Sequence, residues 1–473
     1  MTAALLLKSA TVVDTRDGTL TPGTDVLMHD GRILQVRPGI AVPDGLRSVT
    51  VDVDGTYVVP GYNDMHAHPL GNGDHSGALR LMLAHGITGF RQMSGTRGLL
   101  RARSAGTLAF PTASPALLAT PGPLLTPANA ATPAMAAATV REQHRAGADF
   151  IKVGMVSPEV FFAAQAEALR LGLPIAGHLP PGIDVRRASR IGVKSVEHLG
   201  PGVALFACCS KEHTHIEDVI AEQRRPKLPP FKIPFLEPIL GKALRKMIVN
   251  PANRSRPADV RLLDHTVRSF DDDLARSLAR RLAADGTWQV PTLIRLKTSQ
   301  LCDDPAFAAD PDLRYMGPAT LKEWTAAAEK YSRFPGPARA TFQAAYRRQL
   351  ELTELFDEAG VPMLAGSDSS GAVWEVPGAA LHHEFDELGH AGLTPLRVLQ
   401  MTTLRAAQFL DATDTMGTVA PGKNADLVLL AGNPVESVAN LHRITAVVRA
   451  GRHYSAADLD AIKEGLAAAP AVN

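Results

Sequence analysis

The sequence predicts an α/β protein in which a parallel β-sheet or barrel is flanked by a β-rich domain formed from both chain ends. Three observations carry this prediction. From about residue 58 to 412, short apolar segments alternate with longer helical ones, which is the pattern of βα units. Residues 1–57 and 413–473 instead hold short β-branched segments separated by turns. Hydrophobic residues make up 45% and charged residues 21% of the 473 positions, the balance of a soluble globular protein.

The two chain ends have the same sequence pattern, in which short strand-like segments are separated by turns. Residues 25–28 and 32–36 are strand-like and are separated by His29-Asp30-Gly31, which indicates a hairpin. Residues 425–430 and 444–449 are also strand-like, with glycines between and after them. We therefore expect both ends to pair into one small β-sandwich.

The middle of the chain contains one clear βα unit. The strand predicted over residues 150–154 is followed by Ser157 and Pro158, which suit the cap and the first position of a helix, and Gly172 suits its exit. Thr394 and Pro395 open another helix, expected to run to about Leu410, by the same reasoning.

The charge balance and the cysteine content limit which partners and which compartment we expect for this protein. Lys and Arg number 49 and Asp and Glu 48, so a nucleic-acid partner is not expected. The chain has 3 Cys, two of them adjacent at Cys208 and Cys209, which excludes a secreted disulfide framework and favours a reducing compartment. The apolar run near the N-terminus is too short for a signal peptide, and no membrane span is present. We expect a cytoplasmic homo-oligomer with a small-molecule substrate.

Residues 201–285 are expected to form an insertion in the middle region. Within this range, residues 223–257 hold seven prolines, nine Lys or Arg and one Glu. Such a segment is either a solvated or subunit-contacting insertion, or a lid with a basic rim over a pocket.

Histidines lie at the ends of three predicted strands. His66 and His68 end the apolar strand that begins at residue 58, and residues two apart on a strand point to the same face. His178 and His198 end two further short apolar strands. A single buried histidine is usually structural, but the carboxyl ends of barrel strands meet on one face. The four imidazoles therefore indicate a metal site.

Two charged residues extend this pattern. Asp368 ends another short apolar strand, where it is either a helix cap or, beside the histidines, a ligand or general base. Lys152 lies within an apolar strand, although buried lysine is rare unless it is paired. It either loses its charge through a depressed pKa or binds an anion such as a carboxylate.

These residues together resemble the amidohydrolase superfamily of metal-dependent hydrolases, in its imidazolonepropionase-like and Xaa-Pro-dipeptidase-like branch. The matching segments are residues 60–68 (PGYNDMHAH), 147–153 (GADFIKV), 177–178 (GH), 195–198 (SVEH), 365–368 (AGSD) and 417–428 (GTVAPGKNADLV). The resemblance covers nearly the whole chain except residues 201–345. It implies a distorted (β/α)8 TIM barrel over residues 58–412 and a small β-sandwich built from residues 1–57 and 413–473.

The resemblance also implies a binuclear metal centre. In this branch the lysine that corresponds to Lys152 is carboxylated by CO2, and the carbamate bridges two divalent ions, usually Zn2+. His66, His68 and Asp368 would bind the first ion, and His178 and His198 the second. A hydroxide bridging the ions would be the nucleophile, and Asp368 would pass its proton to the leaving group.

Two features concern the surroundings of this centre. Relatives often carry Arg-Asp-x-Gly-Gly where this chain has Arg91, Gln92 and the residues after them, so Arg91 and Gln92 are candidates for second-sphere or substrate contacts. His382 occupies a position where relatives often carry His-x-Glu, which suggests support of the site. The alternative is an exposed helix histidine.

The function expected from this set is hydrolysis of an amide or peptide-like bond, in a dipeptide or an N-acyl amino acid. A lactone, ester or organophosphate hydrolase would use the same site, so the fold does not choose between them. A mononuclear deaminase would not need Lys152. A non-catalytic relative would have lost ligands, whereas every ligand is present here.

Overall fold

The computed structural model describes residues 3–71, 75–200, 203–222 and 249–469. Most of the basic segment 223–257, and with it the choice between a lid and a subunit contact, lies outside the described residues. Within the described part of the chain, no helix has the length and apolar character needed to cross a membrane.

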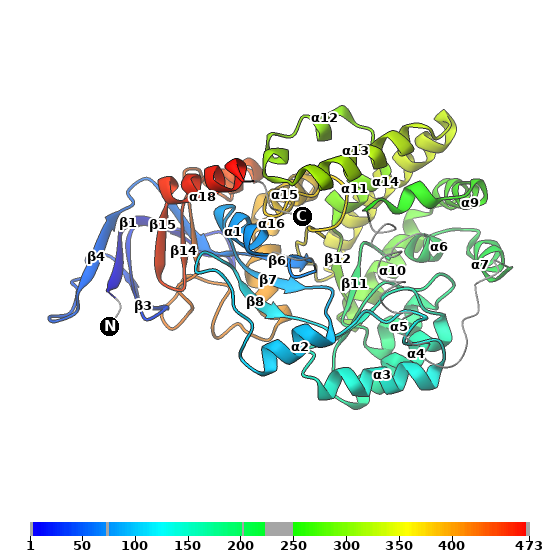
Figure 1. The fold of residues 1–473 in the computed structure, drawn as a ribbon, viewed down its shortest axis with the longest axis horizontal. Coiled ribbons are helices and arrows are strands. Elements are labelled where there is room, and N and C mark those ends of the chain that lie inside the picture. The colour runs from blue at the N-terminus through cyan, green and yellow to red at the C-terminus, as the bar shows by residue number, and fades with distance from the viewer. Residues whose placement is uncertain (1–2, 72–74, 201–202, 223–248, 470–473) are drawn as a thin grey trace.

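Both chain ends contribute to one mixed β-sheet, which confirms that they pair, whereas the expected β-sandwich stays a prediction. The strands of this sheet are β1 (Ala4–Val13), β2 (Leu20–His29), β3 (Arg32–Arg37), β4 (Ser48–Asp52), β5 (Tyr57–Pro60), β13 (Leu427–Leu430), β14 (Ile444–Arg449) and β15 (Arg452–Ser455). Their order is β15-β14-β13-β5-β1-β2-β3, with β4 paired to β1. Figure 1 shows the blue N-terminal strands beside the red C-terminal ones. Hydrogen bonds join all eight strands in a single sheet, with bulges in β1 where it changes partner from β4 to β5.

The predicted hairpin between β2 and β3 is confirmed. Asp30 and Gly31, at its turn, have φ values of 47° and 72°. Two successive residues with positive φ are the mark of a type I′ turn, whose twist matches that of the strands, and an Asp-Gly pair adopts it readily. The local sequence therefore sets the register of this edge of the sheet.

Parallel strands form the middle of the molecule. One sheet has the order β6-β7-β8 and the other the order β12-β11-β10-β9. Their bounds are β6 (Tyr62–Ala67), β7 (Ile87–Gln92), β8 (Ala116–Ala119), β9 (Ile151–Val153), β10 (Ile175–Gly177), β11 (Ser195–Glu197) and β12 (Trp288–Val290).

Single parallel bridges connect the two sheets at both edges. Pro121 after β8 pairs with Phe150 before β9, and Gln289 in β12 pairs with Met363. The segment that contains Met363 then returns to β6 through the bridge between Ser369 and Ala67. The arrangement is therefore TIM-barrel-like, with its strand ends facing one side.

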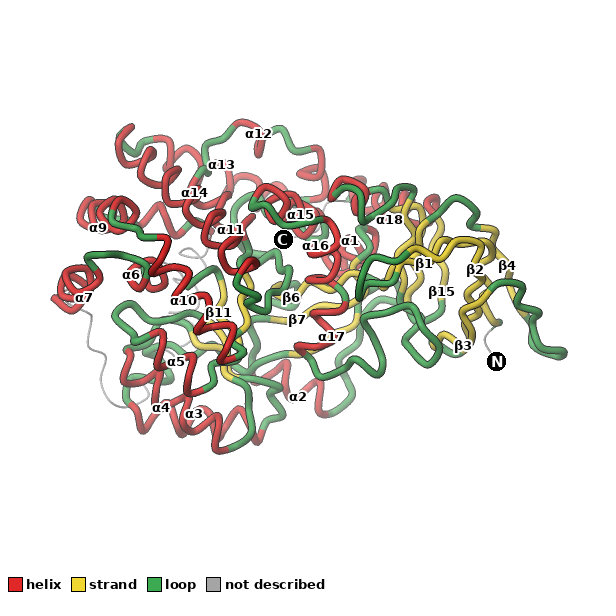
Figure 2. Tube along the Cα trace, turned by 180° about the vertical axis from the view of Figure 1, so that it is seen from behind, coloured by secondary structure: helices red, strands yellow, loops and turns green. Residues whose placement is uncertain are grey.

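Helices lie around these strands on the outside of the barrel-like ring (Figures 1 and 2). The α-helices are α1 (Ser76–Ala84), α2 (Arg97–Ser104), α3 (Pro133–Arg145), α4 (Pro158–Arg170), α5 (Val185–Ile191), α6 (Ala204–Cys208), α7 (His213–Glu222), α9 (Pro257–Arg268), α10 (Asp272–Asp285), α11 (Leu293–Gln300), α12 (Pro305–Ala308), α13 (Pro318–Ser332), α14 (Gly336–Glu358), α15 (Ala379–His390), α16 (Pro395–Thr402), α17 (Leu404–Phe409) and α18 (Ala456–Ala468). Short 3-10 helices are η1 (Pro251–Arg254), η2 (Pro311–Tyr315) and η3 (Val438–His442).

The predicted βα unit after β9 is confirmed in detail. The Ser157 hydroxyl accepts a hydrogen bond from the Val160 amide, Pro158 begins α4, and Gly172 follows its end with φ of 71°. The second predicted helix differs, because it breaks at Thr403 into α16 and α17. The Thr402 side chain just before the break bonds both the amide and the carbonyl of Asn63, which ties this turn to β6.

A helical subdomain, from α12 to the start of α14, packs against the loop that follows Asp368. Trp374 in this loop has its ring 5.9 Å from that of Trp324, and its Nε1 donates to the Cys302 carbonyl. Both indoles belong to one buried apolar cluster with Tyr315 and Tyr331. The loop after Asp368 is thus fixed by aromatic packing.

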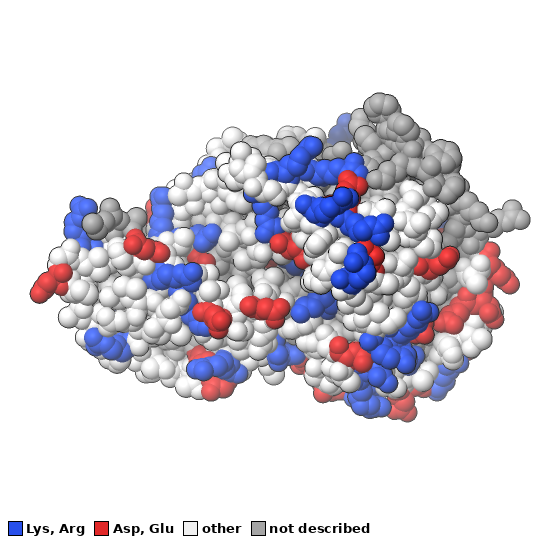
Figure 3. All heavy atoms as spheres, turned by 90° about the horizontal axis from the view of Figure 1, so that it is seen from below, with Lys and Arg blue, Asp and Glu red and all other residues white. Residues whose placement is uncertain are grey.

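Charged side chains of both signs are interspersed on the face seen in Figure 3. Ion pairs form both between and within helices: Arg141 of α3 pairs with Glu167 of α4, and Arg170 pairs with the same carboxylate within α4. This mixture agrees with the near-zero net charge of the sequence.

Candidate metal centre

The predicted ligands all lie at the carboxyl ends of parallel strands. His66 is in β6, and His68 directly follows that strand. His178 and His198 directly follow β10 and β11. Lys152 is in β9, paired in register with Ala176 of β10, and Asp368 follows the segment that bridges β12 and β6. The barrel-like closure therefore brings His68 and Asp368, which are 300 positions apart, to one face.

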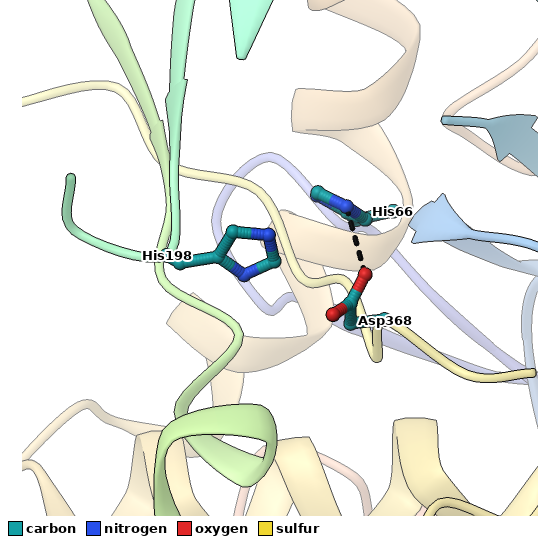
Figure 4. Close-up of side chains that lie close together, drawn as sticks. All are labelled: His66, His198 and Asp368. Carbon is teal, nitrogen blue, oxygen red and sulfur yellow. Dashed lines mark ion pairs between the residues drawn. The ribbon is translucent and has the colours of Figure 1, made fainter. Parts of the chain in front are cut away.

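Three of these residues form a compact group. The ligand atoms of His66, His198 and Asp368 all lie within 4.8 Å of one another, and all three residues are buried. Figure 4 shows His66 and Asp368 facing each other, with His198 beside them. His66 Nε2 lies 3.0 Å from Asp368 Oδ1, yet this nitrogen has no partner in hydrogen-bond geometry among the described residues.

The other two histidines extend the group on either side. His68 Nε2 lies 3.0 Å from the same Asp368 Oδ1. The His178 ring centroid is 5.2 Å from that of His198, which in turn is 4.5 Å from that of His66. Burial lowers the pKa of His68, His178 and His198, and brings that of His178 to about 3. These imidazoles are therefore neutral at pH 7, the form that binds metal ions.

Lys152 is buried at the centre without a partner. It is 3% exposed, and its Nζ makes no hydrogen bond with any described residue. Burial lowers the pKa of Lys152 to about 8, although the nearby charges of Glu197 and Asp368 oppose this shift. The ordinary ion pair expected as an alternative for this lysine is not formed within the described chain.

Three oxygen atoms contact the histidines at the ring nitrogen that faces away from the group. His66 Nδ1 lies 2.7 Å from Glu197 Oε2, His68 Nδ1 2.8 Å from Ser94 Oγ, and His198 Nδ1 2.6 Å from Thr292 Oγ1. Metal-ligating histidines characteristically make such a contact through the other ring nitrogen. All three rings thus present Nε2 to the centre.

A buried charged network, formed by Glu197 and Arg91, lies behind His66. Glu197 accepts hydrogen bonds from Arg91 Nη2 at 2.8 Å and from Ser195 Oγ at 2.6 Å, and Arg91 Nε donates to the Met65 carbonyl. Burial alone would raise the pKa of Glu197, but the charges of Arg91 and His66 hold it well below its usual range. Arg91 is 1% exposed, which places it behind the ligands rather than against a substrate.

Gln92 supports the loop after β6 rather than the ligands directly. Its Nε2 donates to the Ser94 carbonyl at 2.8 Å, and its Oε1 accepts from the Leu70 amide at 3.2 Å. Because Ser94 in turn contacts His68, Gln92 acts one residue further from the centre.

The backbone is strained at the same strand ends. His198, Thr292 and Asp368 have φ values of 56°, 47° and 59°, in the left-handed region that non-glycine residues rarely adopt. Such strain persists where the surrounding structure holds it, typically at functional sites. Gly366 allows the close approach that this requires, since a Cβ there would lie 2.6 Å from His66 Cβ.

Four residues of this centre had no role assigned from the sequence: Ser94, Glu197, Thr292 and Arg295. The Nε of Arg295 in α11 lies 3.1 Å from Asp368 Oδ2. A charged residue just before a strand-end histidine, as Glu197 is, was a usable local signal. Arg295 gave none, because only the tertiary fold brings α11 to Asp368.

His382 lies away from the ligands. Its Nε2 donates to the His85 carbonyl at 2.8 Å, and its ring contacts those of Tyr62, His85, Phe385 and His442. It is 5% exposed, so it is not the exposed helix histidine considered as an alternative. No contact to a predicted ligand is found among the described residues.

The donor set fits a divalent metal ion. The compact group offers two imidazole nitrogens and a carboxylate, which are ligands that zinc and other divalent transition metals accept. Lys152 Nζ has no hydrogen-bond partner among the described residues, although folded proteins otherwise satisfy buried polar atoms of this kind.

Comparison with known proteins agrees with this architecture. Residues 346–453 match the family model described as "Amidohydrolase family". Dihydroorotases of Citrifermentans bemidjiense and of a Geobacter species are 39% identical over 64 residues, a match that spans only 14% of this chain and 14% of each relative.

Solved structures resemble the whole chain. A bottromycin amidohydrolase has a TM-score of 0.70 at 23% identity, and the match covers 100% of this chain and 92% of that one. A Xaa-Pro dipeptidase solved with bound methionine has a TM-score of 0.60 at 17% identity, with 96% of this chain and 100% of that one covered. A prolidase in complex with N-methylphosphonate-L-proline has a TM-score of 0.61 at 19% identity, again with 96% and 100% covered. Residues 346–453 thus match the amidohydrolase family model, and the chain as a whole has the fold of these solved structures.

Proposed function

We propose that the protein is a metal-dependent hydrolase that cleaves an amide or peptide-like bond in a dipeptide or an N-acyl amino acid. The observation that carries this proposal is the convergence of His66, His198 and Asp368 beside the buried Lys152, whose Nζ has no hydrogen-bond partner in the described part of the chain. The structural neighbours named as an amidohydrolase, a dipeptidase and a prolidase support the choice of an amide bond.

We propose that His66, His68, His178, His198, Asp368 and a carboxylated Lys152 hold two divalent ions, with zinc as the expected metal. The charges favour this assignment. With Lys152 protonated, its buried positive charge lies beside the candidate ligands, where it opposes the binding of a divalent ion. Conversion of Lys152 to a carbamate reverses the sign, and the pKa of Lys152, about 8, makes the neutral amine that reacts with CO2 accessible at neutral pH.

The residues of the chain have distinct parts in the reaction. Bound divalent ions supply Lewis acidity, which polarises a carbonyl and makes water nucleophilic at neutral pH. Asp368 accepts the proton that water loses when its oxygen adds to the carbonyl carbon. It returns that proton to the nitrogen as the C–N bond breaks, so that the products are a carboxylate and an amine.

Two rival activities would use the same fold. A lactone, ester or organophosphate hydrolase needs the same ligands, and only a comparison of substrates separates it from an amidase. A mononuclear deaminase does not need Lys152, whose burial without a partner favours the binuclear site. A non-catalytic relative is disfavoured, since the complete ligand set is retained.

Metal analysis and Lys152→Ala test the binuclear assignment together. Protein produced with excess zinc should approach two ions per chain, and Lys152→Ala should lose both the second ion and turnover. Short carboxylates such as acetate, added with zinc, should restore part of the activity by occupying the bridge. One ion per chain at full activity, or near-normal kcat in Lys152→Ala, would contradict the carbamate assignment.

A substrate screen tests the bond type. The zinc-loaded protein should hydrolyse dipeptides or N-acyl amino acids with a higher kcat/KM than lactones, carboxylic esters or phosphotriesters. Asp368→Asn serves as the control for contaminating hydrolases, because general acid–base catalysis contributes on the order of 100- to 10,000-fold. A clear preference for lactones or phosphotriesters would replace the amide proposal by that rival.

A further inference from the structure

We propose that Arg295 is the positioning residue of this centre, which holds Asp368 by one carboxylate oxygen so that the other stays directed at the histidines. The inference rests on the proposed function in that it places Asp368 among the ligands. It concerns the orientation of a side chain, however, and that can be observed without any substrate.

The two oxygens of Asp368 have different partners. Oδ1 lies 3.0 Å from His66 Nε2 and 3.0 Å from His68 Nε2. Oδ2 lies 3.1 Å from Arg295 Nε. One oxygen therefore faces the imidazole nitrogens that would share a metal ion, and the other faces a fixed cation.

A carboxylate at this position needs such a restraint. The terminal torsion of an aspartate side chain is broad and two-fold, so nothing within the residue distinguishes its two oxygens. The backbone fixes only the position of the Asp368 Cα and Cβ atoms. The Asp368 amide donates to the His66 carbonyl at 2.7 Å, and the residue has a φ of 59°. A planar guanidinium on one side removes the remaining freedom.

Arg295 is itself held on a rigid element. It is 6% exposed, in the first turn of α11, which directly follows β12 and Thr292. The amide of Ile294 donates to the buried Glu384 Oε2 at 2.8 Å, and Thr298 Oγ1 donates to the buried Glu375 at 3.1 Å. These contacts anchor both ends of the helix turn that presents the guanidinium to Asp368.

The same helix offers a matched control. Lys297 lies two residues after Arg295 and makes a comparable ion pair, with Nζ 2.7 Å from Glu387 Oε1, which is not one of the candidate ligands. Replacing either cation by methionine removes one charge and one carboxylate partner from α11. Only Arg295→Met removes the partner of Asp368.

Kinetics and metal content distinguish positioning from other roles. In zinc-loaded Arg295→Met, kcat should fall on the order of 10- to 100-fold with KM and bound zinc unchanged, as for other residues that support ligands. Arg295→Lys should retain part of the activity, since it keeps the charge without the planar fork, and Lys297→Met should behave as wild type. A raised KM with unchanged kcat would show a substrate contact instead, and loss of zinc would show support of the whole ligand set; each overturns the inference.

Crystal structures of the zinc-loaded variants test the inference without catalysis. Arg295→Met should show the Asp368 carboxylate rotated or in two orientations, while wild type and Lys297→Met show one. A single unchanged orientation in Arg295→Met would overturn the positioning role. If no amide is hydrolysed by the wild type, the proposed function fails while this orientation is still decided.

Discussion

One hydroxyl group, that of Thr292, determines which ring nitrogen of His198 carries the hydrogen. Thr292 Oγ1 donates its only hydrogen to the Pro291 carbonyl at 2.7 Å, so it must accept from His198 Nδ1, 2.6 Å away. Nδ1 therefore carries the ring hydrogen, and Nε2 keeps its lone pair. Since burial lowers the pKa of His198 well below its usual value, this neutral tautomer is maintained at pH 7.

The replacement Thr292→Val should therefore weaken metal binding. Valine keeps the branched shape at this strained position but removes the acceptor, which leaves the His198 tautomer and ring orientation unfixed. Affinity for zinc, measured by competition with a chromophoric chelator, should fall about 10- to 100-fold. Thr292→Ser keeps the hydroxyl and is the control. Equal affinities in the two variants would mean that the hydroxyl does not set the ligand state.

At this scale the sequence predicted the strand-end residues but not their partners. His66, His178, His198 and Asp368 stand out because each ends a short apolar strand, a local pattern. Thr292 and Arg295 reach the centre from β12 and α11, so their roles depend on distances that no local pattern encodes.

At the level of elements, α15 joins the barrel-like ring to the C-terminal part of the chain through a cluster of rings. His382 contacts His85 at the end of α1 and His442 in η3, with centroids 5.7 and 4.9 Å apart. Burial lowers the pKa of His382 to about 3 and that of His85 well below its usual value. His382 Nδ1 and His85 Nε2 have no hydrogen-bond partner among the described residues, so protonation of either would bury an unpaired charge.

This cluster predicts a loss of stability in acid. In the unfolded chain His382 takes up a proton near pH 6.5, whereas in the folded chain it does so only near pH 3. The stability it contributes is thus complete above pH 6.5 and is lost as the pH falls towards 3. Between pH 6.5 and 5 one such group costs about 2 kcal/mol.

Urea unfolding at pH 7.5 and pH 5 measures this effect. His382→Gln cannot titrate, so its free energy of unfolding should fall by about 2 kcal/mol less than that of the wild type between the two pH values. His383→Gln, on the same helix with a more exposed side chain, is the matched control and should lose as much as the wild type. An equal loss in all three proteins would exclude His382 as the acid-sensitive group.

Elements with strong local signals were predicted well. The hairpin turn at Asp30 and Gly31 and the capped helix α4 follow from turn and cap residues that act over a few positions. The break between α16 and α17 was missed, because it depends on the contact of Thr402 with Asn63, 339 residues away. The bridges that join the two parallel sheets are likewise long-range, and only the resemblance to a known family predicted them.

For the whole molecule, the notable feature is a core shared by the terminal sheet and the barrel-like ring. One buried cluster contains Val13 and Leu430 of the terminal sheet together with Ile151 and Val153 of β9. Polar contacts cross the same boundary, since the Tyr62 hydroxyl donates to the Leu441 carbonyl and Gln400 Nε2 donates to the Thr15 carbonyl. The terminal sheet thus has an apolar cluster of its own as well as side chains in a cluster shared with the barrel-like ring, and the domain division at residues 57 and 412 stays a prediction.

This shared core predicts that the chain unfolds as one cooperative unit. Leu429 and Leu430 are neighbours in β13 and both are buried, but Leu429 packs within the terminal sheet while Leu430 packs in the shared cluster. Leu429→Ala and Leu430→Ala should each cost about 2 to 5 kcal/mol.

All three tryptophans, Trp288, Trp324 and Trp374, lie in residues 58–412, so their fluorescence reports the barrel-like part. If the chain unfolds as one cooperative unit, each variant should lower the midpoint of urea unfolding. The decrease measured by fluorescence should then equal the decrease measured by circular dichroism. If Leu429→Ala left the fluorescence transition unchanged while Leu430→Ala shifted it, the terminal sheet would be an independent folding unit, and the boundaries at 57 and 412 would be domain boundaries in the thermodynamic sense as well.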